Sequence, residues 1–128
     1  MQFGYTILYV DDVAATLAFY GKAFGLATRY MHESGSYGEL ETGATALAFV
    51  SHTLLRQIGK TPQAPELEKP TSEIALVTDD VAAAVKRAIA AGATLVQDST
   101  EMPWGQTIAY VGDSNGFLVE ICTPVSHG

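Results

Sequence analysis

Two segments of this chain repeat one another, and the repeat limits the folds that the chain can adopt. Residues Leu8–Ala15 (LYVDDVAA) match Leu76–Ala83 (LVTDDVAA), 68 positions further along. A second match joins Ala23–Ala27 to Ala90–Thr94, with a shift of one residue. In a chain of 128 residues, each half is too short to bury a large core alone. The repeat therefore predicts two copies of one structural unit within a single domain.

The same order of elements is predicted in both halves. Apolar runs at 3–10 and 73–78 have the residue types of strands. An aspartate pair follows each run, placed to cap a helix that ends near Gly25 or Gly92. Three short strands then follow each helix, at 27–32, 37–41 and 45–51, and at 94–97, 106–112 and 117–123. The pattern predicts an α+β fold of tandem βαβββ modules, forming a curved, barrel-like sheet with helices on the outer face.

The boundaries of the modules follow from the prolines. The segment 53–70 contains three prolines and has no sustained periodicity, so we expect it to link the modules. The N-terminal module then covers 1–52 and the C-terminal module 71–126, within one domain of 1–128. Each module has unpaired sheet edges, and pairing of those edges between two copies predicts a homodimer.

Charge and composition exclude several classes of partner. The formal net charge of −7 disfavours nucleic acid and anionic lipid, and either favours a cationic small molecule or serves solubility alone. No apolar run has the length of a membrane span, and the first residues lack the pattern of a signal peptide. We therefore predict a cytoplasmic protein. A single cysteine, Cys122, excludes an internal disulfide and a thiolate metal cluster.

Several motifs carry a family resemblance. The first strand ends in Val-Asp-Asp-Val, the first helix contains Phe19-Tyr20 and ends in Phe-Gly-Leu, and the segment Asp113–Ile121 reads DSNGFLVEI. This set resembles the vicinal oxygen chelate superfamily of glyoxalases, bleomycin resistance proteins and extradiol dioxygenases. The C-terminal motif departs from the family pattern at Ser114, Asn115 and Phe117. The resemblance covers nearly the whole chain and implies the fold, whereas the functions found on this fold are diverse.

The resemblance also indicates where a metal would bind. In metal-dependent members the ligands come from the first and last strands of each module, which correspond here to Tyr5, Phe49, Glu73 and Glu120. Phe49 has no donor atom, and the Tyr5 phenol is a poor ligand unless it is deprotonated. Two carboxylates alone would hold Mg²⁺ or Mn²⁺ weakly. No metal or other cofactor is therefore expected, and Glu73 and Glu120 are the candidate ligands if a divalent metal is bound.

A binding cavity is the leading hypothesis for the remaining side chains. Strand alternation places Tyr5 and Tyr9 on one face, which is expected to be shared by Phe49. Trp104 lies on a loop that enters a strand, and Glu120 shares its face with Cys122. Aromatic rings and carboxylates suit an aromatic, hydrophobic or cationic ligand. The predicted ligand-binding residues are Tyr5, Tyr9, Phe49, Trp104, Glu120 and Glu73.

Three functions are compatible with these residues. The first is a non-catalytic protein that sequesters a small molecule, as in antibiotic resistance. The second is a divalent-metal-dependent enzyme resembling lactoylglutathione lyase or a dioxygenase, with Glu73, Glu120 and a donor such as His52 or Tyr5. In that enzyme Glu120 would be catalytic, as a general base. The third is a structural or interaction module whose aromatic residues fill a core and leave no cavity.

Overall fold

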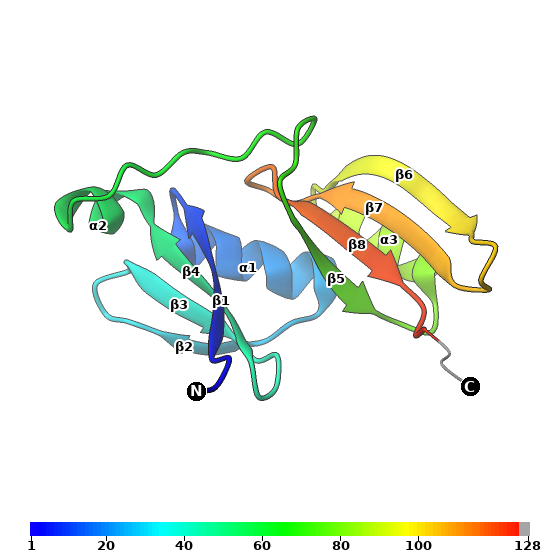
Figure 1. Cartoon of the computed structure of the whole chain (residues 1–128), viewed down its shortest axis with the longest axis horizontal. Coiled ribbons are helices and arrows are strands. Elements are labelled where there is room, and N and C mark those ends of the chain that lie inside the picture. The colour runs from blue at the N-terminus through cyan, green and yellow to red at the C-terminus, as the bar shows by residue number, and fades with distance from the viewer. Residues whose placement is uncertain (126–128) are drawn as a thin grey trace. The chain divides into compact units, whose positions relative to one another are not determined.

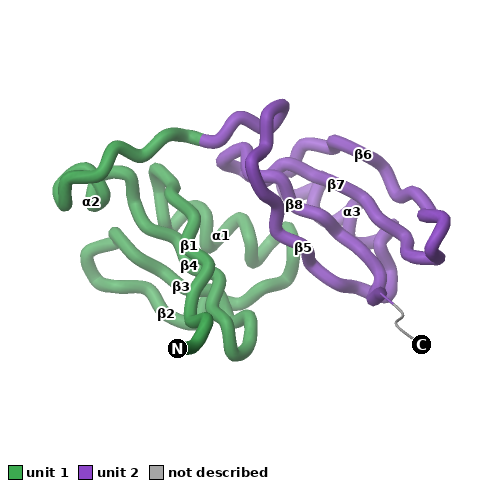
Figure 2. The backbone as a smooth tube through the Cα atoms, viewed as in Figure 1, with its two compact units in different colours: residues 1–64 green, residues 65–128 purple. Residues whose placement is uncertain are grey.

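The chain folds into two compact units that divide between Ala64 and Pro65 (Figures 1 and 2). The computed structural model describes residues 1–125, so the end of the module predicted over 71–126 lies outside the described residues. The division falls within the segment 53–70. No helix of the described part is long and apolar enough to cross a membrane. Each unit is described separately below, beginning with its strands and helices.

Unit 1, residues 1–64, contains one mixed sheet and two helices. In chain order its elements are β1 (Tyr5–Val10), α1 (Val13–Phe24), β2 (Thr28–Met31), β3 (Tyr37–Leu40), β4 (Ala46–Ser51) and α2 (His52–Gln57). The strand order in the sheet is β1-β4-β3-β2. The first strand pairs with β4 in parallel, and the other neighbours are antiparallel. The sheet therefore places the first and last strands of the unit, β1 and β4, side by side, with β1 at one edge.

Unit 2 repeats this arrangement. Its elements are β5 (Glu73–Val77), α3 (Val81–Ala90), β6 (Thr94–Glu101), β7 (Thr107–Gly112) and β8 (Leu118–Cys122). The strand order β5-β8-β7-β6 again places the first and last strands side by side and parallel. The predicted α+β fold of two βαβββ modules is thus confirmed. Neither four-stranded sheet closes into a barrel within the described residues.

Strand β6 is longer than the sequence predicted. It continues to Glu101, whereas the expected strand stopped at Gln97. Register shifts between Leu95 and Gln97, and between Gln97 and Thr100, interrupt its pairing with β7. Such irregularities disturb the alternation of side chains on which the sequence prediction depended.

The aspartate pairs cap their helices as predicted. The Asp12 side chain accepts a hydrogen bond from the backbone N–H of Ala15 at 2.9 Å, and Asp80 accepts one from Ala83 at 3.0 Å. Each bond satisfies an N–H group that has no partner within the helix. Gly25 ends α1 with φ 71°, a left-handed conformation that glycine adopts without strain.

Each helix buries an apolar stripe against one face of its own sheet. In unit 1, Tyr20 of α1 is fully buried, and its ring centroid lies 5.1 Å from that of Phe49 on β4. In unit 2, Val85 and Ala88 of α3 are buried, as are Val119 and Ile121 of β8. One face of each sheet is therefore covered by the helix of its own unit.

Replacement of Gly38 tests how closely α1 packs on its sheet. A Cβ atom at Gly38 of β3 would lie 2.7 Å from Cδ1 of Leu17 and 3.0 Å from Cγ1 of Val13. We expect Gly38→Ala to lower the free energy of unfolding by about 1–3 kcal/mol, because the helix must shift to admit the methyl group. Chemical denaturation measures this loss. Gly4→Ala is the control, since its Cβ would meet nothing within 4 Å. Equal effects of the two changes would contradict the packing.

Candidate functional site

The face of each sheet that lies opposite its helix is called here its open face. In unit 1 the pairing of β1 with β4 places three β1 side chains on this face, those of Tyr5, Ile7 and Tyr9. Tyr5 is 57% exposed and Ile7 is 44% exposed. At the opposite edge of the sheet from β1, Tyr30 of β2 pairs with Glu39 of β3 and is also exposed. The open face of unit 1 is therefore rich in aromatic rings, as predicted for Tyr5 and Tyr9.

The expectation that Phe49 shares this face is wrong. The register pairs Leu8 with Phe49 and Ile7 with Ala48, so Phe49 points toward α1. Its side chain is fully buried against Tyr20. The alignment of the two repeats was shifted by one residue at this strand, and such a shift moves a side chain to the opposite face. The position in unit 1 that corresponds to Glu120 is Ala48.

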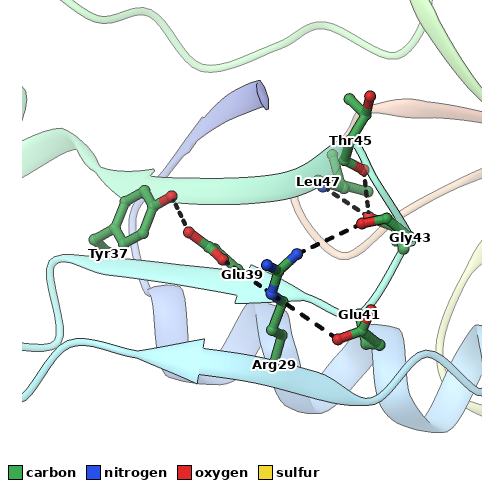
Figure 3. A network of polar contacts seen from close by, with 8 residues as sticks. Arg29, Tyr37, Glu39, Glu41, Gly43, Thr45 and Leu47 are labelled. Atoms are coloured by element: carbon green, nitrogen blue, oxygen red, sulfur yellow. Dashed lines mark hydrogen bonds and ion pairs between the residues drawn. The ribbon is translucent and has the colours of Figure 1, made fainter. Parts of the chain in front are cut away.

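A polar network crosses the open face of unit 1 (Figure 3). The Tyr37 hydroxyl donates a 2.6 Å hydrogen bond to Oε2 of Glu39. Nε of Arg29 lies 3.7 Å from Oε1 of Glu39 and 3.9 Å from Oε2 of Glu41. Arg29 also donates to the carbonyl oxygen of Gly43 at 3.5 Å. Burial and the hydrogen bond to Glu39 raise the pKa of the Tyr37 phenol. The charge of Glu39 is therefore compensated within the unit.

In unit 2 the pairing of strands arranges the open face in rows. The first row contains Glu73 of β5, Leu118 of β8 and Gly112 of β7. The second row contains Ala75, Glu120 and Tyr110, and the third contains Val77, Cys122 and Ile108. Adjacent rows lie about 6.6 Å apart along a strand. Glu73 and Glu120 thus occupy neighbouring strands in neighbouring rows.

The two carboxylates of unit 2 form an acidic pair with Tyr110. The Tyr110 hydroxyl donates a 3.2 Å hydrogen bond to Oε1 of Glu120. Partial burial and the Glu120 charge raise the pKa of Glu73, and the Tyr110 hydroxyl opposes this effect. Burial, followed by the Glu120 and Glu73 charges, raises the pKa of Tyr110 to about 12. Among residues 1–125, no Lys, Arg or His forms an ion pair with either carboxylate.

Trp104 lies at the other end of the open face of unit 2. Its indole N–H donates to Oε1 of Gln106 at 2.8 Å, and the Gln106 amide donates to the carbonyl oxygen of Thr123 at 2.8 Å. The Trp104 side chain nevertheless remains 63% exposed. Gln106 also interacts with the Cys122 thiol, whose pKa is raised by burial and then by Glu120. This chain of contacts connects Trp104 to the acidic pair.

The structure thus groups three of the predicted residues, Glu73, Glu120 and Trp104, on unit 2. Tyr5 and Tyr9 lie on the open face of unit 1, and Phe49 lies in its core. The predicted site left out four polar residues at these faces: Tyr110, Gln106, Tyr37 and Glu39. Tyr110 of β7 pairs with Glu120 of β8, and Glu39 of β3 pairs with Ala48 of β4. Tyr110 and Glu39 therefore occupy corresponding positions in the two units. For Tyr110 and Glu39, the repeated order of strands was therefore a signal that could have found them.

The donor groups do not fit a tightly bound transition metal. Within the described range, no three His, Cys, Asp or Glu side chains are close enough together to hold one ion. His52, a possible donor in the sequence, is buried in unit 1, and its Nδ1 lies 2.7 Å from Oδ1 of Asp11. Unit 2 contributes two carboxylates and a phenol, whereas such a metal usually requires three or four donors that include imidazole or thiolate.

A family model matches most of this chain. The family model for the Glyoxalase/Bleomycin resistance protein/Dioxygenase superfamily matches residues 2–121. No curated protein matches the chain. A glyoxalase-related enzyme from Fulvimarina pelagi has a similar structure, with a TM-score of 0.82 and 24% identity, covering 96% of this chain and 88% of that one.

Two further solved structures are similar. A glyoxalase/bleomycin resistance protein/dioxygenase family enzyme from Burkholderia phytofirmans PsJN gives a TM-score of 0.79 at 24% identity, covering 98% of this chain and 100% of that one. TioX from Micromonospora sp. ML1 gives 0.73 at 20% identity, covering 96% and 98%. At these identities the likeness concerns the fold alone. With the family model matching almost its whole length, the chain belongs to the glyoxalase/bleomycin resistance protein/dioxygenase superfamily.

Proposed function

We propose that this protein binds and sequesters a small organic cation that carries an aromatic or apolar group, on the open face of unit 2. The observation that supports this proposal is the acidic pair of Glu73 and Glu120. In unit 1, Arg29 lies beside Glu39 and compensates its charge. The described part of unit 2 supplies no such cation to its two carboxylates. A bound ammonium or amidinium group would supply the missing charge.

The electrostatics of the acidic pair favour a cation over a neutral ligand. The raised pKa of Glu73 reflects partial burial and repulsion from Glu120, both of which disfavour the charged form. A cation placed beside the pair would attract both carboxylates and so favour the charged form of Glu73. The Tyr110 hydroxyl keeps Glu120 oriented, because it donates to Oε1 of that carboxylate. The net charge of −7 also attracts cations over a longer range.

Trp104 provides an aromatic surface for the rest of such a ligand. Gln106 and Tyr110 are four residues apart, which corresponds to about 13 Å along a strand. A ligand with fused rings next to its cationic group extends from the acidic pair toward Trp104 along this direction. The exposed indole of Trp104, held by Gln106, is available for stacking or for a cation–π contact. Separately, we propose that Tyr5 and Tyr9 contact a ligand on the open face of unit 1, where they offer an aromatic surface.

We also propose that the chain forms a homodimer. Each sheet has two edge strands, β1 and β2 in unit 1 and β5 and β6 in unit 2. Their unpaired backbone groups can bond to a second copy of the chain. Strand pairing between copies would protect these edges from non-specific association.

Naphthylmethylamine is a suitable probe of the proposed site, because it joins a cationic group to two fused rings. We expect it to quench the fluorescence of Trp104, the single tryptophan of the chain. Glu120→Gln should weaken its binding about fivefold, as expected for the loss of one partly exposed charge contact. Naphthylmethanol, an uncharged analogue, should bind more weakly to the wild type and respond little to the substitution. Equal binding of amine and alcohol would refute recognition of a cation.

Glu73→Gln tests the repulsion within the acidic pair without a ligand. Because the pKa of Glu73 is raised in the folded protein, ionisation of Glu73 destabilises the fold at pH values above that pKa. Well below the ordinary pKa of 4.5, Glu73 is protonated in both the folded and the unfolded protein, so its ionisation has no effect on stability. Glu73→Gln should therefore stabilise the protein at neutral pH, by less than about 1 kcal/mol because the side chain is exposed. This gain should disappear as the pH falls below 4.5.

Thermal unfolding of the two proteins across this pH range measures the difference. Glu101→Gln on the edge strand β6 removes the same charge from the same sheet, away from the acidic pair. A gain equal to that of Glu73→Gln would show that net charge, and not repulsion from Glu120, is responsible.

A further inference from the structure

The segment that precedes β5 places one side chain on the open face of unit 2. Leu67 lies against Gly112 of β7, so closely that a Cβ atom at Gly112 would overlap Cδ2 of Leu67 and lie 3.1 Å from its Cδ1. Gly112 belongs to the row of the open face that contains Glu73 and Leu118. The absence of a side chain at Gly112 thus forms a notch, and Leu67 occupies it.

The backbone around Leu67 is held on both sides. The N–H of Lys69 donates to the carbonyl oxygen of Glu66 at 3.0 Å, which closes a turn with Leu67 inside it. Pro65 lies over the turn between β7 and β8, where its carbonyl oxygen would be 3.4 Å from a Cβ atom at Gly116. Figure 2 shows this segment entering unit 2 ahead of β5. Leu67 is therefore seated by local contacts within unit 2.

We propose that Leu67 is a specificity-determining residue, an apolar wall that limits the size of the cationic group bound by the acidic pair. This inference rests on the proposed function. Leu67 stands in the row of Glu73, about 6.6 Å along the strands from the row of Glu120 and Tyr110. A ligand whose rings extend toward Trp104 directs any substituent on its nitrogen the opposite way, toward Leu67. A primary ammonium fits beside the acids, whereas a bulky N-alkyl group meets the wall.

Two substitutions remove the wall by different routes. Leu67→Ala shortens the side chain itself. Gly112→Ala fills the notch with a methyl group and expels Leu67 from its seat, and it tests the same proposal should Leu67→Ala fail to fold. Leu95→Ala is the matched control, because Leu95 is an exposed leucine of the same sheet whose register partner Val111 lies on the helix side.

The experiment compares naphthylmethylamine with its N-butyl derivative by titration of Trp104 fluorescence. We expect the wild type to bind the primary amine about tenfold more tightly. Leu67→Ala and Gly112→Ala should each reduce this preference about fivefold, mainly through better binding of the N-butyl compound. Leu95→Ala should retain the wild-type preference.

The outcomes separate this inference from the proposed function. If the wild type binds both amines equally, or if both variants keep the wild-type preference, the proposed role of Leu67 is contradicted. Recognition of a cation by the acidic pair is unaffected by that result. If the wild type binds neither amine, the proposed function fails and the role of Leu67 fails with it. The proposed role of Leu67 is supported only if the wild type and Leu95→Ala both prefer the primary amine and both Leu67→Ala and Gly112→Ala lose that preference.

Discussion

The parallel pairing of first and last strands in each unit determines which face of the sheet the side chains of those two strands occupy. In unit 2 this pairing sets Glu73 opposite Leu118 and Ala75 opposite Glu120, so both carboxylates emerge on the face that α3 does not cover. A shift of one residue would carry Glu120 into the apolar layer beneath the helix, where an unpaired carboxylate is very costly. The buried Val119 and Ile121 on the other face hold the register in place. Packing of the core therefore specifies the chemistry of the open face.

The same constraint explains what the sequence could and could not predict. The repeat, the aspartate caps and the glycine at the end of α1 depend on local patterns, and they predicted the modules correctly. The position of Phe49 depended on aligning two strands that differ in sequence, and an error of one residue placed a core ring on the open face. Tyr110 was not identified as a partner of Glu120 because their contact depends on the antiparallel register of β7 with β8, ten residues apart in the chain.

Residues without periodicity were harder still to assign. Leu67 belongs to the proline-containing segment 53–70, where no alternation indicates a face. Its placement depends on Gly112, a residue that looks unremarkable in the sequence because a strand-end glycine usually indicates only a turn. The close approach of a side chain from elsewhere is a second reason for glycine in a strand, and only the folded chain distinguishes the two.

The two units have the same backbone plan but different electrostatics, and this difference is informative about function. At the position of β3 that corresponds to Tyr110, unit 1 has Glu39, and Arg29 and Tyr37 satisfy its carboxylate. At the position of β4 that corresponds to Glu120, unit 1 has Ala48, which is fully buried. Unit 1 thus presents a compensated, aromatic surface, whereas unit 2 presents negative charge that its own described residues leave uncompensated. A charge on this face lowers stability because its neighbour repels it, and the proposed cationic ligand would offset that cost.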